Sequence, residues 1–98
     1  MTKPIGRLAI ALLLLAAVLT AQTSIIYGKI TLNNNQPATG VAVSIAGRTV
    51  LTDSGGRFRI DGVPYGTTSM VLTRQGAPVA KYEVTINQPQ QQINKKCP

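Results

Sequence analysis

The sequence predicts an all-β fold, an antiparallel β-sandwich of six or seven short strands. After residue 21 the apolar residues alternate with polar ones over short runs, and no segment has the period of a helix. Clusters of Gly, Pro, Asn and Asp separate these runs roughly every eight to twelve residues. A parallel sheet would need helices to connect its strands, so the pattern favours antiparallel pairing.

The first 21 residues are predicted to be a cleaved secretory signal peptide. Lys3 and Arg7 give it a basic start, residues 8–19 form an apolar run, and the small residue Ala21 precedes the polar Gln22. A transmembrane helix needs roughly 20 apolar residues, more than this run contains. We therefore expect no stable transmembrane segment after processing, and a secreted, periplasmic or cell-surface location.

The first strand is expected at residues 26–32, in which the even-numbered residues share one face. The run 33–37, which contains three Asn and one Pro, interrupts it. Alternating valine and isoleucine predict a second strand at 41–45. A Gly-Arg turn at 47–48 then leads into a third strand at 49–52.

A tight turn is expected next, in which Asp53 bonds backbone N–H groups and Gly56 supplies a positive φ. The strand that follows places Phe58 in the core, where it is the one large aromatic ring available. Its alternate residues Arg57 and Arg59 are expected to face outward. These residues fit roles in folding, independent of any ligand.

Pro64 and Gly66 mark the next corner of the chain. A later strand is expected to turn Met70 and Leu72 inward, and the last strand is expected at residues 82–86. The sandwich is therefore assigned to residues 22–87.

Residues 88–98 have almost nothing apolar to bury and are predicted to be a flexible tail, polar and basic in character. The single cysteine, Cys97, falls in this tail, where we expect it to be exposed. A lone thiol in an exported chain indicates either an intermolecular disulfide or an incidental free group, and the sequence leaves both open.

Several strand and turn motifs of the sequence are shared with a known family. The chain opens with a Gly-x-Ile at residues 28–30, and residues 40–45 match a second strand. Residues 52–60 resemble a Thr-Asp-x-x-Gly-x-Phe-x-Ile hairpin, and residues 63–66 resemble a Val-Pro-x-Gly corner. Together these motifs resemble the carboxypeptidase regulatory-like domains. The resemblance implies an immunoglobulin-like, transthyretin-like (prealbumin-like) sandwich that serves as a structural or binding module beside peptidases, outer-membrane receptors and surface proteins.

The composition removes most enzyme classes. The chain contains no His, one Cys and only three Asp or Glu. A Ser or Cys nucleophile would therefore lack its usual base, and paired carboxylates are scarce. Asp53 and Ser54 could suggest a calcium loop, but such a site needs more carboxylate ligands. We expect no catalysis, no metal and no cofactor.

The chain is basic, with a formal net charge of +7. Arg57 and Arg59 form a candidate contact face for a protein partner or for an acidic polysaccharide of the cell envelope. The alternative is that exposed strand arginines only discourage edge-to-edge pairing. Nucleic acid is an unfavoured partner, because export separates the protein from it and few aromatic residues lie among the charges.

Three functions remain. The first is a non-catalytic secreted or periplasmic module that binds a protein or an envelope component. The second is a self-assembling surface or filament subunit, a homo-oligomer joined by β-strand addition through an arm at residues 22–26. The 77 residues that follow the predicted signal lack an internal disulfide, so burying strand edges in other copies would stabilise them. The third is an accessory subunit or inhibitor of a separate secreted enzyme.

Overall fold

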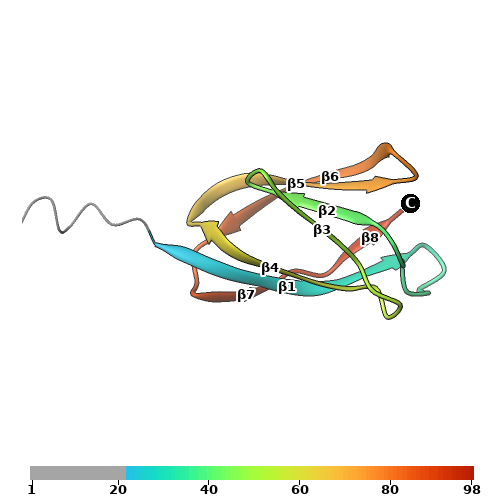
Figure 1. Ribbon diagram of the computed structural model, residues 1–98, viewed down its shortest axis with the longest axis horizontal. Helices are drawn as coiled ribbons and strands as arrows, with labels where there is room; N and C mark the ends of the chain where they lie inside the picture. The colour runs from blue at the N-terminus through green and yellow to red at the C-terminus, as the bar shows by residue number, and fades with distance from the viewer. Residues whose placement is uncertain (1–21) are drawn as a thin grey trace, which may run out of the picture.

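The computed structural model describes residues 22–98, which form two sheets packed face to face around one apolar core (Figure 1). The prediction of an all-β sandwich is confirmed, whereas the predicted signal peptide lies outside the described residues. Residues 22–98 form eight strands instead of the six or seven expected. In chain order they are β1 (Thr23–Leu32), β2 (Ala42–Ile45), β3 (Arg48–Leu51), β4 (Arg57–Pro64), β5 (Gly66–Arg74), β6 (Ala77–Ile86), β7 (Gln90–Gln92) and β8 (Lys95–Cys97).

The first sheet is built around β1. One edge of β1 pairs with β4 in antiparallel register, and the other pairs with β7 and then with β8, both parallel to it. The second sheet has the order β3-β2-β5-β6, with every pair antiparallel. In Figure 1, β1, β4 and β7 lie in the lower layer and β2, β5 and β6 in the upper one. The outer edges of the second sheet are therefore β3 and β6.

The prediction of a flexible tail at residues 88–98 is wrong. This segment supplies β7 and β8, and its apolar residues Ile93 and Cys97 are only 7% and 0% exposed. Composition underestimated the segment for two reasons. First, strand pairing uses backbone N–H and C=O groups, which every residue except proline offers in full. Second, two buried apolar side chains, Ile93 in the middle of the segment and Cys97 near its end, are enough to pack it against the core.

Gly28 sits where β7 gives way to β8. The backbone of Ile93 packs closely against Gly28 of β1 at this point, and a Cβ on Gly28 would lie 1.8 Å from the Ile93 carbonyl oxygen. On either side of this contact, the Ile93 N–H donates to the Tyr27 carbonyl (2.9 Å) and the Lys29 N–H donates to Asn94 Oδ1 (2.9 Å). The absence of a side chain at residue 28 is therefore what allows this close approach.

The core contains the inward residues of both sheets and of the C-terminal segment. Its buried members are Ile26, Ile30, Ala38, Val41, Val43, Ile45, Phe58, Ile60, Val63, Met70, Leu72, Val84, Ile86, Ile93 and Cys97. Residues 22–98 contain no disulfide, and their one thiol is free. Packing of this core therefore carries most of the stability of the domain.

The turn before β4 is fixed by a carboxylate and a glycine. Asp53 Oδ1 accepts hydrogen bonds from the N–H groups of Gly55 and Arg57, each at 2.9 Å. Gly56 has a φ of 74°, and a Cβ there would lie 2.4 Å from the Ile30 carbonyl oxygen. Both the backbone angle and the contact with β1 thus require glycine.

The next corner joins β4 to β5. Pro64 is exposed as the last residue of β4, and Gly66 begins β5 with a φ of 133°. That backbone angle lies in the region that favours glycine, so the chain can reverse here from one sheet to the other.

Thr52 joins two loop segments inside the protein. Its hydroxyl donates to the Ala38 carbonyl at 2.5 Å and accepts the Val41 N–H at 2.9 Å, and the residue is 5% exposed. We expect Thr52→Val to lower the free energy of unfolding by about 1–3 kcal/mol, because it leaves a buried donor and acceptor without partners. Urea unfolding checks this value. Thr52→Ser keeps the hydroxyl and should recover most of the loss, and equal losses in the two variants would contradict the hydrogen-bond explanation.

Candidate functional site

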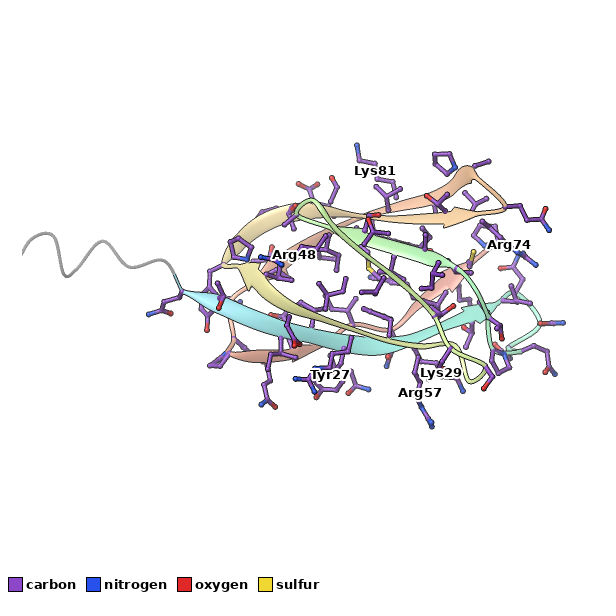
Figure 2. All side chains as sticks on the ribbon, in the orientation of Figure 1. Tyr27, Lys29, Arg48, Arg57, Arg74 and Lys81 are labelled. Atoms are coloured by element: carbon purple, nitrogen blue, oxygen red, sulfur yellow. The ribbon has the colours of Figure 1, made fainter. Side chains whose placement is uncertain are left out.

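The outward residues of β1 and β4 form a basic surface. Tyr27 lies opposite Arg59 in the β1–β4 register, and Lys29 lies opposite Arg57. We call these four residues the basic face. Directly opposed residues of antiparallel strands have Cβ atoms about 5 Å apart, so the four side chains are close neighbours. Figure 2 shows Tyr27, Lys29 and Arg57 projecting from the same side of the sandwich.

Little negative charge offsets this face. Arg59 Nε donates to Asp61 Oδ1 at 2.8 Å, but the two side chains are 64% and 66% exposed, so solvent weakens the attraction. This is the only ion pair within residues 22–98. Lys29 and Arg57 thus present charges that no carboxylate of the described chain neutralises at close range.

Two hollows open beside Lys29 and share it. One, of about 370 Å³, lies over the outer side of β1, β4 and β7 and includes Tyr27, Arg57 and Gln92 in its lining. The other, of about 510 Å³, is lined by six residues, and we call it the lysine groove: Lys29, Thr31, Tyr82, Asn94, Lys95 and Lys96. The positive surface therefore extends from β4 across β1 to β8.

Contacts between β6 and β8 hold the lysine groove in shape. The Tyr82 hydroxyl donates to the Lys96 carbonyl at 2.6 Å, and the Lys95 ammonium lies 4.9 Å from the centre of the Tyr82 ring. Lys95 and Lys96 fall in the segment that was predicted to be a flexible tail, so the groove was not predicted. The signal that could have found it is the pair Ile93 and Cys97, isolated apolar residues in an otherwise polar segment.

The other predicted site residues differ in how far they are exposed. Arg57 and Arg59 are exposed as expected, and Phe58 is 5% exposed. Cys97 is fully buried, contrary to the expected exposed thiol. An intermolecular disulfide at Cys97 would therefore require β8 to separate from β1. The Asp53 carboxylate is occupied by turn N–H groups.

Two further features bear on the class of site. Within residues 22–98, no three His, Cys, Asp or Glu side chains gather closely enough to hold a metal ion. The same residues contain no helix of the length and hydrophobicity that crossing a bilayer requires. What the described chain presents is a basic, partly hollowed strand surface with one exposed tyrosine.

Residues 25–94 match the family model of the carboxypeptidase regulatory-like domain. The chain belongs to this family. The match includes β7, so the family pattern extends past the sandwich limit expected at residue 87. The search of curated proteins found no match to this sequence.

Solved structures share the fold of this regulatory-like domain. Two are chains of type II cohesin–X-dockerin complexes from Acetivibrio cellulolyticus. The C-terminal interface mutant has a TM-score of 0.56 and 20% identity, and the N-terminal interface mutant has 0.57 and 21%. In both, the match covers 74% of this chain and 52% of the other, so this chain spans about half their length. A 9R-lipoxygenase from Cyanothece matches with a TM-score of 0.53 and 15% identity, over 79% of this chain and 17% of that one.

Proposed function

We propose that this regulatory-like domain is a non-catalytic binding module, secreted or periplasmic, that contacts an acidic protein or cell-envelope component through the basic face. The observation that carries the proposal is the uncompensated charge of Lys29 and Arg57 beside the exposed ring of Tyr27. Such a surface attracts acidic partners and steers their approach.

The comparisons support a binding role at a coarser level. The family is named for a regulatory-like domain and not for a catalytic one, and two of the structural neighbours come from complexes between proteins. A basic strand surface with an amphipathic tyrosine is also suited to a polar contact, because Tyr supplies apolar area and a hydroxyl together.

The self-assembly alternative is less favoured by the geometry. Its proposed arm lies within β1, which pairs on one edge with β4 and on the other with β7 and β8. Ile26 and Ile30 are fully buried in the same molecule. Donating this arm to a neighbour would therefore take the first half of the central strand out of its own sheet. Light scattering of the purified protein tests this, and we expect the mass of a monomer.

The binding function is tested by sedimenting the purified protein with cell-envelope fractions of its source organism. We expect Arg57→Gln/Arg59→Gln to weaken binding about fivefold, as expected for two exposed ion pairs worth roughly 0.5 kcal/mol each. Binding should also fall as salt is raised. The matched control is Arg48→Gln/Arg74→Gln, which removes the same charge from the second sheet (Figure 2).

The control separates a specific face from a general effect of net charge. Equal loss of binding in both double variants would show that only net charge matters and would contradict the proposed face. Failure of the unmodified protein to sediment with any envelope fraction, in low salt, would contradict the binding function itself.

A further inference from the structure

The lysine groove is built where the C-terminal segment changes strands. β7 ends at Gln92 and β8 begins at Lys95, and between them the side chain of Asn94 takes the place of a backbone partner for the Lys29 N–H. This break leaves the groove open between β8 and β6. The groove thus lies between an edge of the first sheet and an edge of the second.

The lining groups of the groove are donors and cations. Three ammonium groups line it, from Lys29, Lys95 and Lys96, and no carboxylate does. Because Asn94 Oδ1 already accepts the Lys29 N–H, the amide NH₂ is the part of Asn94 left for a ligand. Lys29 and Lys95 are only partly exposed, so their charges are less screened than those of free surface lysines. This set of groups is suited to carboxylates.

The same groove offers no stacking surface for a sugar ring. The one aromatic ring in its lining is that of Tyr82, which Lys95 covers at 4.9 Å, while the Tyr82 hydroxyl is bonded to Lys96. Glycan sites commonly stack sugars on an open aromatic face, and none is open here. The observations therefore favour a peptide over an acidic polysaccharide in this groove.

Strand β6 adds a backbone template beside the groove. Gln91 accepts the Asn87 N–H through Oε1 and donates Nε2–H to the Thr85 carbonyl, so these backbone groups face the free edge of β6. In antiparallel pairing alternate residues share an orientation, which puts the N–H and C=O groups of Lys81 and Glu83 on that edge too. Gln91 covers the edge only near Thr85 and Asn87. An extended peptide can pair with the rest.

We propose that the lysine groove binds an extended acidic peptide segment of a partner protein, which adds as a strand to β6 at residues 81–83 and turns its carboxylates toward Lys29, Lys95 and Lys96. This inference rests on the proposed binding function. It specifies the class of partner, an acidic peptide, for the part of the basic surface that the lysine groove forms. The volume of about 510 Å³ accommodates several side chains.

The test uses a fluorescein-labelled peptide of eight residues that alternates Glu and Val, added to the purified protein. Fluorescence anisotropy gives its Kd, and amide chemical shifts in ¹⁵N NMR spectra locate it. We expect shifts at Lys81, Glu83 and the groove residues. Lys29→Gln/Lys95→Gln should raise Kd about fivefold, whereas Arg48→Gln/Arg74→Gln, with the same charge loss elsewhere, should change it by less than about twofold.

Three comparisons make the test decisive. Lys29→Arg/Lys95→Arg keeps the charges and should restore most of the affinity, which distinguishes charge loss from misfolding. The matching peptide with Lys in place of Glu should not bind. Polygalacturonate, an acidic glycan, should bind more weakly than the Glu peptide and give no shifts along β6.

The outcomes separate this inference from the proposed function. Tight binding of polygalacturonate in the groove without binding of the Glu peptide would overturn the peptide inference. Sedimentation with envelopes that persists while neither anion shifts the groove residues would overturn it too, and would leave the binding module standing. If the unmodified protein neither sediments with envelopes nor binds the Glu peptide, the result contradicts the peptide inference and the proposed binding function together.

Discussion

Gly28→Ala is expected to release the C-terminal segment from the sandwich and to lower the free energy of unfolding by about 3–5 kcal/mol. The added Cβ would lie 1.8 Å from the Ile93 carbonyl oxygen and 2.7 Å from its carbon, so the two backbones must separate. Separation breaks the hydrogen bonds on both sides of this contact and exposes Ile93 and Cys97. Burial of two such side chains supplies roughly the energy stated. A single core of this size supplies about the same amount in total, so much of the protein should unfold along with the segment.

Two measurements follow this change. Urea unfolding gives the loss of stability, and the reaction of Cys97 with a thiol reagent under native conditions reports whether β8 has left β1. In the unmodified protein the thiol should react slowly and a non-reducing gel should show no covalent dimer. Gly55→Ala is the control, because its Cβ would meet only ordinary contacts, the nearest being Asp53 Oδ1 at 3.5 Å. A protected thiol in Gly28→Ala would contradict the docking described here.

Phe58→Ala is expected to leave most of the protein unfolded at 25 °C. Phe58 is 5% exposed as the second residue of β4, and removing a buried Phe side chain costs about 3–5 kcal/mol. A single core of this size supplies about the same amount in total. Tyrosine fluorescence during urea unfolding and the dispersion of amide NMR signals measure the effect.

The control for this substitution is an exposed residue of comparable size. Leu51 is 68% exposed at the end of β3, so Leu51→Ala should change stability by no more than about 0.5 kcal/mol. A cooperative transition of near-normal midpoint in Phe58→Ala would show that the sandwich can close around the cavity, against the rigid packing inferred from the burial.

Local patterns explain why so much of the sandwich was predictable. Strands β1, β2, β4, β5 and β6 carry alternating apolar residues, and their period of two fixes which side chains face the core. The turn before β4 was equally predictable. Asp53 accepts turn N–H groups and Gly56 adopts a positive φ, and few other residue types do either. The outward direction of Arg57 and Arg59 follows from the same parity.

The lysine groove lacked any such local signal. β7 consists of three glutamines, and what orders it is backbone pairing with a strand about 65 residues earlier in the chain, the separation between Lys29 and Asn94. Parity within one strand cannot indicate a parallel partner so distant in sequence. The positions of Lys95 and Lys96 therefore depended on tertiary contacts, and composition alone pointed to the opposite result.

The pairing of β1 with β8 also sets an order of events in folding. β1 leaves the ribosome before the other strands, yet one of its edges stays uncovered until residues 90–97 have been made. Contacts this distant in sequence carry a large loop-closure entropy and slow the folding of β proteins. We expect the nascent chain to stay without its final structure until its last strands emerge, and to gain that structure in one late cooperative step.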